Sequence, residues 1–136
     1  MVRQDLHINQ GETWQHVFTH RDPAGAAVDL TGFSARMAVR DRVGGTLEAY
    51  LSTEAGEQSG GSITLGGGEG TVTLDMSAEQ SRRLASNLAS FSVLVAPIEK
   101  QPAEVTFFYD LELVSASGAV VRAFAGRVIV NREVTE

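Results

Sequence analysis

Apolar and polar side chains alternate at every second residue along most of this chain, and that pattern restricts the fold more than any other feature. Successive side chains of a β-strand point to opposite faces of its sheet, so alternation predicts strands with one buried face. In residues 33–40, Phe33, Met37 and Val39 would share one face, with polar side chains mostly on the other. Such strands are typical of an antiparallel sheet that has one face in solvent.

The same alternation predicts strands along the rest of the chain. Residues 105–113 carry the longest apolar face, formed by every second side chain. Phe108 lies on the opposite face of that strand, so we expect the strand to be central and covered on both sides. Phe108 itself would either pack under a helix or be exposed at a subunit contact. The other expected strands are residues 13–20, 47–51, 63–65, 72–74, 93–95 and 120–130, the last with a bulge or bend at Gly126.

Turn-forming residues separate these segments. The glycine-rich residues 59–70 surround the apolar pair Ile63 and Leu65, and the alternation resumes at Val72 and Leu74. This pattern predicts two short strands joined by a glycine hairpin. They lack the lysine and the following helix of a phosphate-binding loop. Proline, glycine, aspartate and serine predict further turns at residues 22–25, 29–32 and 115–118.

One short helix is predicted. Ser77 and Gln80 have the spacing of a capping box, and residues 78–85 contain no glycine or proline. A helix of two or three turns is unstable alone, so we expect it to pack against the end of a sheet.

About eight strands, one short helix and regular turn signals together predict an all-β, mainly antiparallel fold. Both a β-sandwich and a partly closed barrel fit this pattern. The 136 residues have the length of one ordinary domain, and no repeat or linker divides them. We therefore expect a single domain over residues 1–136.

Composition excludes several classes of function. The sequence has no cysteine, which removes disulfides and thiolate chemistry. Its net charge of −6 disfavours nucleic acid as a partner, and we expect the adjacent Arg82 and Arg83 to face water. The N-terminus lacks the apolar run of a secretory signal, and no apolar stretch could span a bilayer. We expect synthesis in the host cytoplasm and no membrane partner.

Catalytic and metal-binding patterns are also missing. His16 and His20 would lie about 13 Å apart on one strand, too far to share a metal, so we interpret them and His7 as ordinary side chains. We expect Trp14 to pack in the core rather than stack on a sugar. We expect no enzymatic activity and no cofactor. The shorter carboxylates show no spacing that pairs them for catalysis; they are Asp5, Asp22, Asp29, Asp41, Asp75 and Asp110.

Taken in order, five segments resemble a recurring structural domain of tailed bacteriophages and prophages, similar to the N-terminal domain of the baseplate upper protein. Each motif is short, and the resemblance lies in their shared order over nearly the whole chain. The segments are residues 8–14, 28–37, 70–80, 109–113 and 126–135.

The resemblance implies a non-enzymatic virion protein of the tail or baseplate region that acts through assembly contacts. In the family a helical or fibre-anchoring extension follows this domain, whereas this sequence ends at Glu136. A tail-tip, adaptor or decoration subunit is therefore the closer expectation. Two alternatives remain open at this point: a capsid decoration or head–tail joining protein, and a carbohydrate-binding β-sandwich that recognises a host surface.

Assembly contacts are expected where loops, termini or outward aromatic residues are available to neighbours. We expect residues 1–5, 59–70 and 131–136 to become ordered on contact with other virion proteins, and a homo-oligomer to form in the particle. The candidate contact residues are Phe108, Gly66, Gly67, Gly68, Arg132 and Val134.

Overall fold

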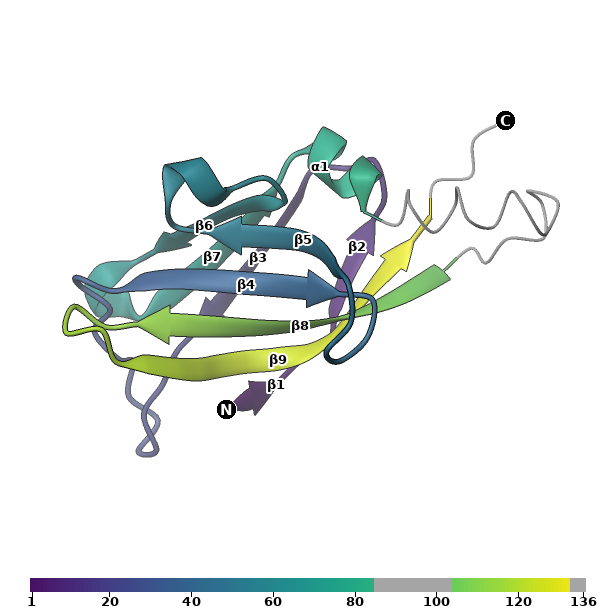
Figure 1. Cartoon of the computed structure of the whole chain (residues 1–136). Coiled ribbons are helices and arrows are strands. Elements are labelled where there is room, and N and C mark those ends of the chain that lie inside the picture. The colour runs from purple at the N-terminus through teal and green to yellow at the C-terminus, as the bar shows by residue number, and fades with distance from the viewer. Residues whose placement is uncertain (85–103, 133–136) are drawn as a thin grey trace, which may run out of the picture.

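The computed structural model describes residues 1–84 and 104–132. These residues form one curled, mixed β-sheet with one short α-helix (Figure 1). β1 and β2 lie one after the other along β9, so the sheet has eight strand positions. The strands are β1 (Val2–Arg3), β2 (Leu6–Asn9), β3 (Trp14–Thr19), β4 (Ser34–Arg40), β5 (Leu47–Ser52), β6 (Gly61–Leu65), β7 (Thr71–Met76), β8 (Glu104–Val114) and β9 (Val120–Asn131).

The strand order across the sheet is β1/β2, β9, β8, β4, β5, β6, β7 and β3. Five of the pairings in the described part of the chain are antiparallel: β9–β8, β8–β4, β4–β5, β6–β7 and β7–β3. Three are parallel, namely β1 and β2 with β9, and β5 with β6. The prediction of an all-β, mainly antiparallel fold is therefore confirmed.

The sheet curls until its two edges approach each other, which makes a half-barrel rather than two separate sheets. The indole Nε1 of Trp14 on β3 donates to the carbonyl oxygen of His7 on β2 at 2.9 Å. The ring of Phe18 on β3 stacks on Phe124 of β9, with centroids 4.2 Å apart. Among the described strands β3 pairs with β7 alone, so side chains rather than backbone bonds join the two edges.

The concave face of the sheet holds the core. Alternate residues of nearly every long strand point inward, and these are the apolar positions of the sequence pattern. Leu30, from the loop before β4, and Leu84, after the helix, complete the cluster. The strand residues with side chains almost fully buried include Leu6, Ile8, Met37, Leu51, Leu74, Phe107, Leu111 and Leu113.

The longest predicted strand is β8, and its central position between β4 and β9 is confirmed. The expectation that it is covered on both sides is wrong. Its outward residues Phe108, Asp110 and Glu112 are only half-buried, because the convex face of the sheet is turned to solvent.

The helix α1 (Ala78–Arg83) begins with the predicted capping box. Ser77 Oγ accepts from the Gln80 backbone at 3.1 Å, and the Gln80 side chain accepts from the Ser77 backbone at 2.8 Å. The buried Ser81 hydroxyl donates to the carbonyl oxygen of Glu12 at 2.7 Å, which holds the helix against the β2–β3 turn. Arg82 and Arg83 are exposed, as expected.

The predicted turns are also confirmed. The carbonyl oxygen of Asp22 accepts from Gly25 at 2.9 Å, Asp29 Oδ1 accepts from the Thr31 amide at 2.9 Å, and Ser115 accepts from Gly118 at 2.9 Å. Strands β6 and β7 form the predicted hairpin, with a short 3₁₀ turn, η2 (Gly67–Glu69), between them. A second 3₁₀ turn, η1 (Ala55–Glu57), follows β5. The strand predicted at residues 93–95 lies outside the described residues.

The N-terminal residues correct another expectation. Residues 1–5 are expected to become ordered on contact with other virion proteins, yet β1 within them already pairs with β9 of the same chain, and β2 continues that pairing. The alternation of Leu6 and Ile8 with polar residues places both side chains in the core. Burial of these two side chains anchors the segment.

Gly126 has a different role from the predicted bulge. The irregularity in β9 lies at Ala123, where the register with β8 shifts by one residue. At Gly126 the backbone of Gln4 crosses so closely that any Cβ would overlap the Gln4 carbonyl oxygen. That oxygen accepts a hydrogen bond from the Tyr109 hydroxyl at 2.7 Å, at the break between β1 and β2.

We expect Gly126→Ala to lower the free energy of unfolding by about 1–3 kcal/mol, because the overlapping atom belongs to backbone and cannot rotate away. The measurement is urea denaturation followed by tryptophan fluorescence. Gly68→Ala is the matched control, since a Cβ there meets no atom within 4 Å, and its effect should stay below about 0.5 kcal/mol. Equal effects of the two variants would contradict the close approach at Gly126.

Candidate functional site

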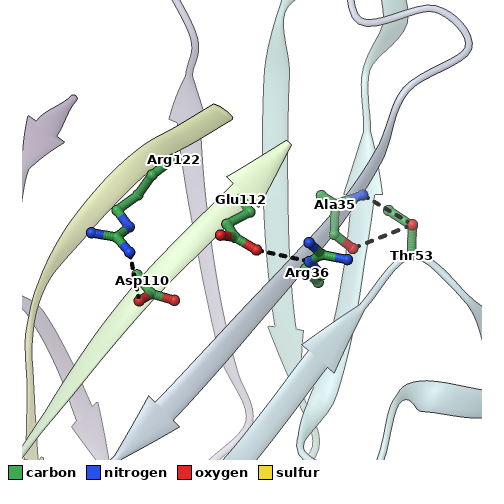
Figure 2. A network of polar contacts seen from close by, with 6 residues as sticks. All are labelled: Ala35, Arg36, Thr53, Asp110, Glu112 and Arg122. Atoms are coloured by element: carbon green, nitrogen blue, oxygen red, sulfur yellow. Dashed lines mark hydrogen bonds and ion pairs between the residues drawn. The ribbon is translucent and has the colours of Figure 1, made fainter. Parts of the chain in front are cut away.

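The convex face of β4, β8 and β9 carries a ladder of oppositely charged side chains. Arg36 Nε lies 2.8 Å from Glu112 Oε1, and Arg122 Nη2 lies 3.8 Å from Asp110 Oδ2 (Figure 2). The register places Glu112 directly between Arg36 and Arg122. Cross-strand pairs of this kind favour one register. They add little stability here, because all four side chains are partly exposed.

Beside this ladder, Thr53, which directly follows β5, is hydrogen-bonded to the start of β4. The Thr53 hydroxyl accepts from the Ala35 amide at 3.2 Å and donates to the Ala35 carbonyl at 3.4 Å (Figure 2). A polar hollow of about 370 Å³ lies over the ladder. Its lining is Arg36, Ala38, Arg40, Tyr50, Asp110 and Glu112.

A second hollow of about 480 Å³ lies on the same face, where β1, β8 and β9 meet the β4–β5 loop. We call it the Phe108 hollow. Its lining combines two apolar side chains with two guanidinium groups and one carboxylate, and consists of Arg3, Gln4, Asp5, Val43, Phe108, Gly126 and Arg127.

Phe108 lies among charged neighbours. On β4 the residue directly opposite is Arg40, and on β9 it is Arg127. Val43, in the β4–β5 loop, lines the same hollow and is 87% exposed. An apolar side chain this far into solvent gains nothing from the fold of its own chain.

The β4–β5 loop holds Val43 in a defined position. The Asp41 amide donates to the Thr46 carbonyl at 3.1 Å, and the Thr46 amide donates to Asp41 Oδ1 at 2.8 Å. Arg40 Nη1 donates to the Gly45 carbonyl at 3.1 Å. Gly44 supplies the positive φ of 73° that the turn requires. The exposure of Val43 is thus built into the turn.

Asp5 and Arg127 form the closest ion pair of the hollow. Asp5 Oδ2 lies 2.7 Å from Arg127 Nη2 and 3.2 Å from Nε, and Oδ1 accepts from the Arg127 amide at 3.1 Å. These hydrogen bonds lower the pKa of the Asp5 carboxyl and raise the pKa of the Arg127 guanidinium. The pair ties the N-terminal segment to β9 on the convex side of the sheet.

The histidines do not form a metal site. No group of three potential ligands gathers within residues 1–84 and 104–132. His16 lies between Trp14 and Phe18, with ring centroids 6.1 and 4.5 Å away. Burial lowers the pKa of His16, and it lowers that of His20 together with the nearby N-terminal charge. Trp14 is half-buried against the core, as expected.

The candidate contact residues do not form one surface. Phe108 lines the hollow described above, near the last residue of β4. The three glycines Gly66, Gly67 and Gly68 lie in the β6–β7 turn, next to the segment that precedes β4. The Gly67 carbonyl accepts from Leu30 at 2.9 Å, so this turn is already held by its own chain. Arg132 follows the end of β9 and is half-buried; Val134 lies outside the described residues.

Sequence analysis missed most of the Phe108 hollow. Arg3 and Asp5 were assigned to a tail, although the alternation at Leu6 and Ile8 was a signal that the segment is a strand. Val43, an apolar residue in an otherwise polar loop, was a weaker signal. Arg127 carried none, because its partner is 122 positions away.

The comparisons with known proteins leave the family open. No protein-family model matches the sequence, and a search of curated proteins finds no match. No helix in the part of the chain that the structure describes is both long and apolar enough to cross a membrane.

We expect the Asp5 carboxyl to titrate below its ordinary value of 3.8. Because the folded pKa is the lower one, the stabilisation is present above pH 3.8 and is lost as the pH falls through the folded value. Arg127→Gln should raise the Asp5 pKa towards 3.8, since it removes the charged guanidinium and keeps the backbone hydrogen bond. Carbon-detected NMR titration measures this. Arg122→Gln is the control and should leave Asp5 unchanged; an equal shift in both variants would contradict the pairing.

We expect His16 to titrate below 6.5, its ordinary value. The unfolded chain then binds a proton more readily than the folded one, so stability falls as the pH drops from 6.5 through the folded pKa. His16→Phe keeps the ring packing and should reduce this loss. Urea denaturation at pH 7.5 and pH 5.0 measures the difference. An unchanged pH dependence in the variant would contradict the effect of burial on His16.

Proposed function

We propose that this chain is a non-enzymatic structural protein of a bacteriophage virion, in the tail or baseplate region, that works through protein–protein contacts. The contact role is carried by one observation, the Phe108 hollow. Aromatic and arginine side chains are enriched at the centres of protein interfaces. Here Phe108 and exposed Val43 lie beside Arg3 and Arg127 on a solvent-facing sheet.

The virion assignment rests on the resemblance of the five segments to phage structural domains. The half-barrel is compatible with it, since such a domain offers a broad sheet face to neighbours. Other virion proteins are the proposed partners, and the particle is the proposed location. A homo-oligomer remains part of the proposal, because virion subunits assemble by repeated contacts.

The carbohydrate-binding alternative has less support. Sugar recognition uses flat aromatic faces that are open to solvent. The sole tryptophan, Trp14, is half-buried, and its indole donates to the His7 carbonyl. The experiment below distinguishes a capsid protein from a tail protein.

The decisive experiment is to induce particle production in the host that carries this gene and to analyse purified virions by quantitative mass spectrometry. We expect peptides of this chain at a fixed ratio to the tail proteins, and retained when tails are separated from heads. Recovery with the heads alone would favour the capsid alternative. Absence from the particles would overturn the proposal, with a known tail protein as the positive control.

A further inference from the structure

We propose that the Phe108 hollow binds an extended acidic segment of a partner protein, one that carries an apolar side chain two residues from a carboxylate. The inference rests on the proposed function and specifies the chemistry of the partner. Three features of the described residues carry it: an apolar pair that the fold leaves exposed, guanidinium groups in excess of carboxylates around it, and a rigid frame.

The apolar part consists of Phe108 and Val43. Phe108 is half-buried on the convex face, and Val43 is held in solvent by the hydrogen-bonded β4–β5 loop. Between β8 and this loop the hollow has a volume of about 480 Å³. That space accommodates one or two aliphatic side chains, and a partner side chain placed there would remove both apolar groups from water.

The charge around this pair is positive, although the whole chain carries −6. Arg3, Arg40 and Arg127 surround Phe108, and Asp5 compensates only Arg127. The Arg3 side chain makes no hydrogen bond or ion pair within residues 1–84 and 104–132. Arg40 donates to a neutral carbonyl, that of Gly45. The Arg3 guanidinium is thus available to a carboxylate from outside, and Arg40, opposite Phe108 on β4, adds positive charge nearby although it lines the polar hollow with Asp110 and Glu112.

The ladder on the same sheet shows that this excess is local. There Arg36 and Arg122 each have a carboxylate partner, at 2.8 and 3.8 Å. At the Phe108 hollow, Arg3 and Arg127 lie beside the apolar Phe108 and Val43, and Asp5 is the one carboxylate of the lining. This combination matches a ligand that has both a carboxylate and an apolar side chain.

A second copy of this chain fits the hollow less well. A two-fold interface places the same patch of both subunits together, so the arginines of both hollows would gather there with only the two Asp5 carboxylates of their lining to offset them. Two chains of charge −6 also repel each other at a distance. An acidic segment of a different protein avoids the first cost and brings carboxylates to the local excess of arginines. In an extended segment, side chains two residues apart point the same way, so a carboxylate and an apolar group can enter together.

The test uses the full chain, labelled with ¹⁵N, and a blocked heptapeptide probe. The probe contains glycine and serine with one glutamate and, two positions later, one leucine. Titration at about 50 mM salt keeps electrostatic screening weak. We expect saturable amide shifts confined to Arg3–Asp5, the β4–β5 loop, Phe108 and Arg127. A probe with glutamine in place of glutamate should bind about three- to ten-fold more weakly.

Variants of exposed or half-exposed residues test the two parts of the hollow separately. Arg3→Ser should weaken the glutamate probe by a similar factor and leave the glutamine probe unaffected. Phe108→Ser should weaken both probes. Arg21→Ser is the matched control, because Arg21 is exposed like Arg3 and, within residues 1–84 and 104–132, donates only to the neutral Gly25 carbonyl, but lies at the distant 22–25 turn. It should change the binding of neither probe. Unchanged amide spectra outside each mutated site would show that the variants are folded.

Several results would overturn the inference. Shifts that do not saturate, or that lie elsewhere on the sheet, would remove the hollow as the site. Equal binding of the glutamate and glutamine probes would remove the carboxylate from the partner. A dimer in light scattering that Phe108→Ser dissociates would assign the surface to a second copy. Failure of peptide binding, with the chain still present in purified particles, would overturn this inference and leave the proposed function intact.

Discussion

The rest of the structure depends on the long antiparallel pair of β8 and β9. On one side β9 pairs with β1 and β2, and on the other side β8 pairs with β4 and so joins the remaining strands of the sheet. Strand β8 pairs along its length with β9 and along much of it with β4. Its inward side chains, such as Phe107 and Leu111, are fully buried and form the middle of the core. Its outward side chains supply Phe108 to the hollow, and Asp110 and Glu112 to the charged ladder. One strand therefore sets both the packing and the chemistry of the exposed face.

The N-terminal segment completes this arrangement from the far end of the chain. It pairs with β9 in parallel, and its side chains point alternately to the concave and the convex face of the sheet. Leu6 and Ile8 enter the core, while Asp5 pairs with Arg127 on the convex side. Between β1 and β2, the Gln4 carbonyl accepts from the Tyr109 hydroxyl, and the Gln4 backbone lies so close to Gly126 that a Cβ at that position would overlap it. The wall of the Phe108 hollow is thus formed by residues more than 120 positions apart in the sequence.

Charged side chains on the convex face form two groups, one paired and one with an excess of arginines. In the ladder, Arg36 and Arg122 have carboxylate partners, and that part of the face is close to neutral. Around Phe108 the arginines outnumber the carboxylates, and the apolar Val43 is fixed above them. A binding surface needs groups that the fold has not already satisfied, and they are found here rather than in the glycine turn at residues 66–68. That turn accepts a hydrogen bond from the Leu30 amide, so it stabilises the fold of its own chain.

The sequence by itself determined the local structure: the strands, the capped helix and the turns. Alternation in residues 33–40 and 105–113, the Ser77–Gln80 spacing and the aspartate–glycine turns act through neighbouring residues, so each can be read from a short stretch of sequence. Tertiary structure alone decided how the sheet closes and which groups meet on its convex face. Asp5 pairs with Arg127, and the Gln4 backbone lies against Gly126, because β1 and β2 pair with β9 at the other end of the chain. No local sequence pattern predicts such a pairing. Whether Phe108 was covered depended on which side of the sheet the chain leaves open. That outcome depends on the curl of all eight strand positions together, because only the concave side is filled by the side chains of the chain itself.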